Sequence, residues 1–236
     1  LLSFASGQRM PTVSEAYGYY LYNPVDGYLY LGNPDLPIET SRQVEWQNSL
    51  TSSQGRMSLN LYFYKFNHYI FGQVMSEDAF SYANGWKKYI DGGAARIFGL
   101  EWSVLHRLSS HFMFQGGVNY EKSRLDDYDD CLPLIPPLEF HGSLTYEDKR
   151  FWLQLDTRAA AAQTDNSIVS GENSTPAFLV INLKGEVDVL SGLKLNLGVN
   201  NLTNQLYYEH LDWGDVYRPG RSGFISLTLN NGILGQ

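Results

Sequence analysis

The chain has 236 residues and a formal net charge of −8, which argues against a nucleic-acid partner because such partners require a basic surface. Aromatic residues make up 14% of the chain and charged residues only 18%, whereas about 25% charged is usual in soluble proteins. No apolar run reaches the roughly 18 residues of a transmembrane helix, no signal-peptide pattern opens the sequence, and the lone Cys131 excludes an intramolecular disulfide.

Apolar and polar residues alternate along most of the chain, with the period of two that is typical of strands. Leu193, Leu195, Leu197 and Val199, for example, alternate with Lys, Asn and Gly. The first residues look like the middle of a strand, so we expect the chain to be a piece of something longer. In chain order, about ten strands are predicted near residues 1–6, 43–50, 57–64, 98–104, 112–121, 138–146, 151–158, 179–188, 193–203 and 220–230.

The connections between these strands are alternately short and long. A β-sandwich has no reason to keep every second connection short, whereas a transmembrane β-barrel places short turns in the periplasm and long loops outside. The polar positions carry Gln, Glu, Asn, Ser, Thr, Asp and Lys, which suits a water-filled lumen. We therefore predict an all-β fold, an antiparallel transmembrane β-barrel, with a large soluble β-sandwich as the alternative. The predicted outer loops lie near 11–40, 71–93, 124–137, 164–176 and 204–219.

Three parts of the sequence resemble the C-terminal half of TonB-dependent outer-membrane receptors. The first is SGQRMPTVSEAY at 6–17 followed by GNPDLPIETS at 32–41. The second is ARIFGLE at 95–101, and the third is LGVNNLTNQLYYEH at 197–210 followed by PGR at 219–221. The motifs occur in the family's order and spacing, and the likeness spans almost the whole chain. The family's last strand usually ends on an aromatic residue, but Leu229 and Asn230 stand there and the chain runs on to Gln236.

The resemblance implies a barrel of about 22 strands around an N-terminal plug, of which this chain would supply the last ten or so. It also implies TonB-driven import of a ferric siderophore, haem, cobalamin or copper across the outer membrane of a Gram-negative bacterium. The partners would be outer-membrane lipid, the remaining strands and plug, and TonB, contacted through an upstream segment. No enzymatic activity and no cofactor are expected.

The outer loops carry the candidate ligand-binding residues. Tyrosines near 17–30 could stack on a flat or catecholate ligand, or pack among themselves. Residues 86–88 could hold an anionic chelate, or form a solvated loop tip. His210 could ligate a metal, but a lone histidine needs companions. The candidates are Tyr20, Tyr28, Tyr30, Trp86, Lys87, Lys88, His210, Trp213 and Arg218.

Other interpretations remain open at this point. Clustered carboxylates could bind calcium, and a histidine–methionine pair could suit copper, although neither shows a ligand spacing. A passive porin or a barrel-domain adhesin is the alternative function, and a barrel enzyme is a third. The chain could pair with missing strands or close on itself as a smaller barrel. The residues of the two weaker metal hypotheses are Asp126, Asp127, Asp129 and Asp130, and His68 with Met75.

Overall fold

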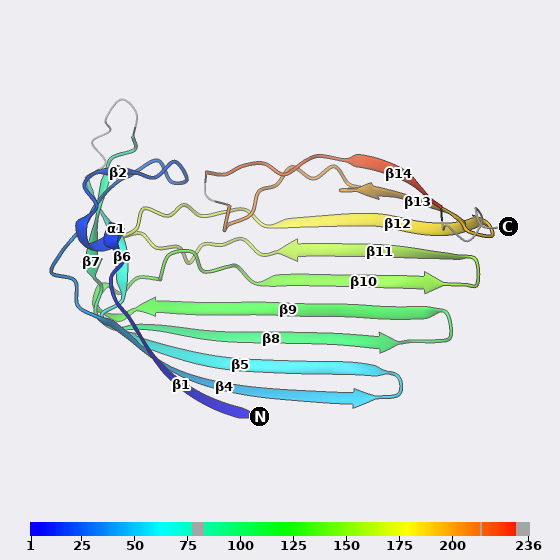
Figure 1. Cartoon of the computed structure of the whole chain (residues 1–236), viewed down its shortest axis with the longest axis horizontal. Coiled ribbons are helices and arrows are strands. Elements are labelled where there is room, and N and C mark those ends of the chain that lie inside the picture. Colours follow the sequence, from blue (N-terminus) through cyan, green and yellow to red (C-terminus); the bar gives the residue numbers. More distant parts are fainter. Residues whose placement is uncertain (77–82, 213, 230–236) are drawn as a thin grey trace.

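The computed structural model describes residues 1–76, 83–212 and 214–229, and its main feature is one antiparallel sheet of ten strands, here called the wall (Figure 1). Each strand of this sheet pairs with the strands of the sheet that come before and after it along the chain. The prediction of ten strands is confirmed. They are β1 (Leu2–Arg9), β4 (Glu39–Ser52), β5 (Gly55–Asn67), β8 (Ala95–Arg107), β9 (Phe112–Leu125), β10 (Glu139–Glu147), β11 (Phe151–Ala160), β12 (Phe178–Leu190), β13 (Leu193–Asn200) and β14 (Ser222–Leu229).

One face of the wall is apolar because the strand register brings apolar residues opposite one another. Leu144 lies opposite Leu155, which lies opposite Leu183, and the same face carries Trp102 opposite Val118. These side chains are not covered by a second sheet, and Leu155, for example, is 42% exposed. An exposed apolar surface across ten strands far exceeds the patches found on soluble monomers. The soluble β-sandwich is therefore wrong for the described residues.

The opposite face of the wall is polar and its side chains bond across strands. Asn182 donates to Asp156 at 2.9 Å, and the hydroxyls of Ser58 and Ser103 lie 2.6 Å apart. The Tyr62 hydroxyl donates to Glu121 at 2.5 Å. These contacts agree with the predicted alternation of one apolar and one polar face along each strand.

The wall is an open sheet in the described residues. β1 is hydrogen-bonded to β4 alone, and β14 to β13 alone, so β1 and β14 are its two edges. Closure of the chain on itself as a smaller barrel is therefore not observed. The described residues contain no helix that is long and apolar enough to span a membrane.

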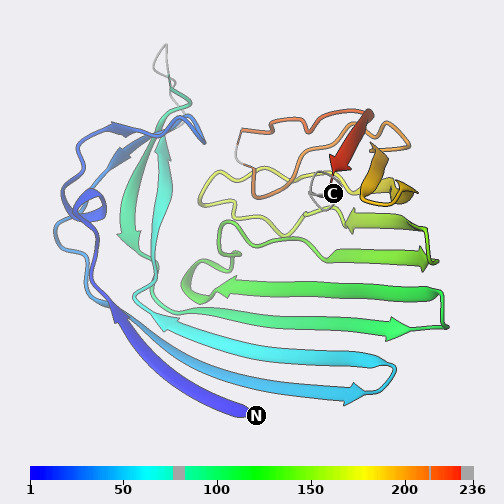
Figure 2. The same ribbon diagram turned by 45° about the vertical axis from the view of Figure 1, so that its right-hand side comes forward.

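The segments predicted as loops near 11–40 and 71–93 contain regular structure, which corrects that part of the prediction. They form helix α1 (Val13–Tyr17) and strands β2 (Leu21–Tyr22), β3 (Leu29–Leu31), β6 (Ile70–Ser76) and β7 (Trp86–Asp91). The four strands form a second sheet in the order β2-β3-β7-β6, here called the end sheet, in which β3 and β7 are parallel. Figures 1 and 2 show it standing across the end of the wall where the long connections lie. The loop near 124–137 also contains a short 3₁₀ helix, η1 (Asp126–Tyr128).

An ionic cluster ties α1 and the end sheet to the wall. Thr12 begins α1 with a capping box, in which its hydroxyl accepts the Glu15 amide and Glu15 accepts the Thr12 amide. The Arg9 guanidinium donates to Glu15 at 2.8 Å and to Glu39 at 3.0 Å. Glu39 also accepts the backbone amide of Ile70 at 3.0 Å, at the start of β6. One arginine thus links β1, β4, α1 and, through Glu39, β6.

The apolar core lies where the end sheet meets the wall. It joins a residue of β6 to the ends of β8 and β9 and to the loop that follows η1. The end sheet is therefore packed on the wall and does not project from it as an isolated hairpin. The buried residues of this cluster are Phe71, Ala95, Leu125, Leu132 and Ile135.

Candidate functional site

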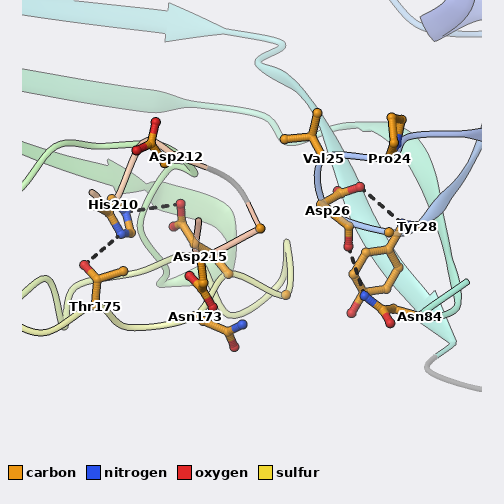
Figure 3. Close-up of a pocket in the computed structure, with 14 residues that line it drawn as sticks. Pro24, Val25, Asp26, Tyr28, Asn84, Asn173, Thr175, His210, Asp212 and Asp215 are labelled. Atoms are coloured by element: carbon orange, nitrogen blue, oxygen red, sulfur yellow. Dashed lines mark hydrogen bonds and ion pairs between the residues drawn. The ribbon is translucent and has the colours of Figure 1, made fainter. Parts of the chain in front are cut away.

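A cavity of about 410 Å³ opens at the long-connection end, between the β2–β3 turn and two loops of the wall. The turn supplies Asp26 and Tyr28, the loop 161–177 supplies Glu172, and the loop 201–221 supplies His210 and Asp215. Figure 3 shows the residues of the turn on one side of the opening and the residues of the two wall loops on the other. The remaining lining residues are Pro24, Val25, Gly27, Asn84, Gly171, Asn173, Thr175, Asp212 and Gly214.

The side of the cavity formed by the end sheet is held by a buried ion pair. The Lys87 ammonium lies 2.7 Å from the Asp26 carboxylate, and the two side chains are 1% and 6% exposed. The Tyr30 hydroxyl donates to the same carboxylate at 2.6 Å, and the ammonium lies 4.3 Å from the centre of the Tyr28 ring. Burial lowers the pKa of Lys87, although Asp26 opposes that shift. Burial and the bond to Asp26 raise the pKa of Tyr30.

This arrangement decides between the two interpretations of Lys87. The alternative of a solvated loop tip is wrong for Lys87, because its side chain is buried within the end sheet. Its charge is balanced by Asp26, so its main role in this structure is to hold the turn that lines the cavity. Lys88, the next residue of β7, is half-buried and lies in register with Leu31 and Gln73.

The wall side of the cavity is organised around Glu172. Its carboxylate accepts the amides of Leu134 at 2.8 Å and Ser167 at 2.9 Å, and lies 3.3 Å from Nε2 of His210. That last contact has the distance of an ion pair but not the alignment of a hydrogen bond, since Nε2 has no hydrogen-bond partner among the described residues. Nδ1 of His210 lies 3.3 Å from the Thr175 hydroxyl. Glu172 thus joins three of the long connections.

The pKa of Glu172 is lowered by this environment. Burial opposes ionisation, but His210 and the amides of Ser167 and Leu134 outweigh it. The contacts from the three loops therefore stabilise Glu172 in its ionised, carboxylate form.

A second ionic group anchors the last long connection to the wall. The Arg158 guanidinium, on β11, donates to both carboxylate oxygens of Glu209 at 2.6 and 2.8 Å. Arg218 lies 2.6 Å from Asp212 and 3.4 Å from Glu209. Hydrogen bonding from Arg158 lowers the pKa of Glu209. Arg218 is therefore engaged within its own loop, and the predicted candidate Trp213 lies outside the described residues.

The tyrosines of the first long connection contact other aromatic rings. Tyr20 lies edge-on to Trp86, with ring centres 6.0 Å apart, and to Tyr19 at 5.0 Å. Tyr30 lies 5.1 Å from Tyr89. This matches the alternative in which these rings pack among themselves, while leaving Tyr20 37% exposed.

Three of the four aspartates proposed for calcium contact arginines or a backbone amide. Asp126 binds Arg96, Asp129 binds Arg124, and Asp130 accepts the Val169 amide. On the copper hypothesis, His68 bonds to Asp91 at 2.7 Å. Within residues 1–76, 83–212 and 214–229, no three His, Cys, Asp or Glu side chains are grouped so as to hold a metal.

Sequence reasoning missed Asp26 and Glu172, the residues that organise the two sides of the cavity. Asp26-Gly27 is a dipeptide that favours tight turns, and it lies between short apolar and aromatic stretches, so it was a usable signal. Nothing around Glu172 distinguishes it from other loop carboxylates.

Comparison with known proteins identifies the family. The family model described as "TonB dependent receptor-like, beta-barrel" matches residues 1–202. The chain belongs to the TonB-dependent receptor β-barrel family. Its members are transporters, not enzymes, in agreement with the prediction that this chain is not an enzyme. A comparison with curated proteins found no match.

Several solved structures share the fold. The copper transporter OprC has a TM-score of 0.80 at 22% identity, over 97% of this chain and 36% of that one. A mutant of the ferric enterobactin receptor PfeA from Pseudomonas aeruginosa has a TM-score of 0.71 at 19% identity, over 97% and 37%. The siderophore receptor PirA from Pseudomonas aeruginosa has a TM-score of 0.66 at 18% identity, over 97% and 38%. The chain therefore spans little more than a third of these receptors, and the wall corresponds to a fragment of their barrels.

Proposed function

We propose that this chain is the C-terminal part of the barrel of an outer-membrane receptor that imports a metal chelate or a similar scarce nutrient with energy supplied through TonB. The wall carries this proposal, because one face is apolar, the other is polar, and every long connection folds at the same end. A transmembrane barrel with a water-filled interior requires this combination.

The open edges of the wall indicate how the rest of the receptor would complete it. Unpaired backbone groups cannot face hydrocarbon, so β1 and β14 need neighbouring strands in a membrane. In the proposed receptor, the remaining strands close the barrel, the plug fills it, and outer-membrane lipid covers the apolar face. TonB would act on an N-terminal segment outside this chain.

The proposed cargo is a metal or its chelate. The fold's similarity to the copper transporter OprC, the ferric enterobactin receptor PfeA and the siderophore receptor PirA supports this proposal. The cavity adds a chemical preference, because four carboxylates and, among the described residues, no lysine or arginine line it. Two of the four, Asp26 and Asp212, are paired with Lys87 and Arg218 behind the lining, which leaves Glu172 and Asp215 as the acidic groups without an arginine or lysine partner in the described part of the chain. Such a lining favours cargo that presents cationic or hydrogen-bond-donating groups over a polyanionic one. Of the predicted residues, Tyr28 and His210 line the cavity. Tyr20, which precedes β2, and Trp86 and Lys88, on β7, remain contact candidates. Tyr30, Lys87 and Arg218 hold the surrounding structure.

An uptake assay tests this function. The full-length receptor is expressed in a strain that lacks its own receptors, with and without TonB, and is offered labelled ferric siderophores, haem, cobalamin and copper. We expect accumulation of one class of cargo, and only when TonB is present. Accumulation that is independent of TonB, together with steady conductance through the purified protein in planar bilayers, would instead identify a passive porin.

A pair of variants tests the cavity. Asp215→Asn removes a carboxylate of the lining, and Asp188→Asn removes one near the short-turn end of β12. We expect the first to weaken cargo binding about tenfold, as for loss of a hydrogen bond to a charged group, and the second to leave it unchanged. Equal affinities in both variants would contradict a role for this cavity.

A further inference from the structure

A row of cations crosses four neighbouring strands of the wall. Arg42 of β4 lies directly opposite Lys65 of β5, Lys65 lies opposite Arg96 of β8, and Arg96 lies opposite Arg124 of β9. All four side chains are exposed. Since adjacent strands are about 4.8 Å apart, the row is about 15 Å long.

The row lies on the apolar face of the wall. Residues two apart on a strand share a face, and Val44, Phe63 and Phe98 lie two residues from Arg42, Lys65 and Arg96. These three apolar residues are themselves opposite one another and form the next row. The cations stand on the side of this row that leads to the long connections, so they mark the boundary between the apolar surface and the outer loops.

The charges of the row are only partly balanced within the chain. Like charges directly opposite each other on neighbouring strands destabilise a sheet. Asp126 lies 2.5 Å from Arg96, and Asp129 lies 2.5 Å from Arg124. Within the described residues, Arg42 and Lys65 form no ion pair. A negatively charged group bound from outside would relieve their repulsion.

The row of cations does not reflect an overall excess of basic residues in the chain. Lys122, two residues from Arg124 and on the same face, extends the row. Its ammonium lies 3.8 Å from the carboxylate of Asp165. Five of the chain's 17 lysines and arginines therefore gather on one rim of a chain whose net charge is −8.

We propose that this rim binds an anionic lipid of the outer leaflet, with its phosphate groups against Arg42 and Lys65 and its acyl chains along the apolar row of Phe63 and Phe98. Arginine matches phosphate with two parallel N–H groups, and lysine contacts it as a point charge. Long cationic side chains reach from an apolar surface to the polar boundary of a membrane. The juxtaposition of cations and exposed aromatic rings favours a lipid over a free anion. The inference rests on the proposed membrane setting but concerns neither cargo nor TonB.

The test measures lipid A, a phosphorylated outer-leaflet glycolipid, that remains bound to the full-length receptor purified in detergent. The variant Arg42→Gln/Lys65→Gln removes the two unpaired charges. We expect its retained lipid A, quantified by mass spectrometry, to fall on the order of tenfold. The matched control Lys149→Gln/Arg150→Gln removes two exposed charges at the opposite, short-turn end and is expected to retain lipid A fully. Arg42→Lys/Lys65→Arg keeps both charges and is also expected to retain it.

Three results would overturn the lipid site. The first is equal retention by Arg42→Gln/Lys65→Gln and the control, with folding verified by heat-modifiable migration. The second is equal rebinding of dephosphorylated lipid A, and the third is displacement of the lipid by inorganic phosphate. Uptake measured on the same variants separates the two proposals. Lipid retention that needs Arg42 and Lys65, in a protein without TonB-dependent uptake, would leave the lipid site standing and reject the proposed function.

Discussion

The wall and the end sheet are both β-sheets, but different contacts hold them together. Strands of the wall reach 14 residues, pair along their length and leave one apolar face uncovered. Strands of the end sheet have two to seven residues, and a buried ion pair, an ionic cluster and an apolar core fix their positions. The wall thus depends on the solvent that surrounds it, whereas the end sheet depends on particular side-chain pairs.

The largest effect is expected from a substitution that destabilises the end sheet and leaves the wall unchanged. Asp26→Ala removes the carboxylate that Lys87 contacts, and breaking a buried pair in this way costs about 3–5 kcal/mol. We expect much faster hydrogen exchange in β3 and β7, with unchanged heat-modifiable migration of the barrel. The double variant Asp26→Ala/Lys87→Met removes the charge as well and is expected to recover part of the protection. Unchanged exchange in the single variant would contradict this account.

A charge on the apolar face of the wall is expected to have the next largest effect. Leu155→Arg places a charge in the middle of β11, where contact with hydrocarbon makes it cost about 2–4 kcal/mol. Gln154→Arg places the same charge one residue away on the polar face and is expected to change stability little. Urea unfolding of the receptor in lipid vesicles measures both. An equal loss of stability in the two variants would contradict the assignment of one face of the wall to lipid and the other to water.

The contacts of Glu172 are expected to have a moderate effect on the loops. Glu172→Gln weakens acceptance of the Leu134 and Ser167 amides and removes the charge beside His210, a loss of about 1–3 kcal/mol in local stability. Hydrogen exchange of those two amides measures it. Glu147→Gln, at the short-turn end, is the control and is expected to leave both amides protected.

The pH dependence of the same loops follows from the direction of the Glu172 shift. Its pKa is lower in the folded protein than its ordinary value of 4.5, so it stabilises the loops above that value. This stability is lost as the pH falls through the lower, folded pKa. We expect protection of the Ser167 amide to fall in that acid range and the fall to be much smaller in Glu172→Gln. If Glu172→Gln lost protection of the Ser167 amide at acid pH as fully as the unmodified protein, a group other than Glu172 would cause the pH dependence.

The smallest effect is expected at the anchor of the last loop. Arg158 and Glu209 have 40% and 20% of their side chains exposed, and exposed ion pairs contribute up to about 1 kcal/mol. Glu209→Gln should therefore speed proteolysis within 201–221 only slightly. If Glu209→Gln changed local stability as much as Asp26→Ala does, the partly exposed Arg158–Glu209 pair would stabilise its loop as strongly as the buried Lys87–Asp26 pair stabilises the end sheet. That result would contradict the expected difference between exposed and buried ion pairs.

The wall was predictable because its signal is repeated many times. Each strand carries an alternation of its own, so β11, predicted at 151–158 and observed at Phe151–Ala160, is found from sequence alone. The apolar face follows from the same pattern. The position of Arg42 directly opposite Lys65 was not predicted, because it depends on the strand register as well as on the strands.

The end sheet and the cavity were less predictable for the opposite reason. β2 and β3 are too short to show a period, and β6 begins with the adjacent buried residues Ile70 and Phe71, which do not alternate. Tyr28 and His210 were chosen as loop residues with ligand chemistry, and both line the cavity. Their separation in the chain gave no sign that they would meet.

The parallel pairing of β3 with β7 has a consequence for how such receptors diversify. The two strands come from separate excursions of the chain, so neither excursion completes the sheet alone. Recombination between relatives that exchanged only one of them would bring together strands that had never been selected as neighbours. The two excursions should therefore be inherited as a unit, and engineered chimaeras should exchange both at once.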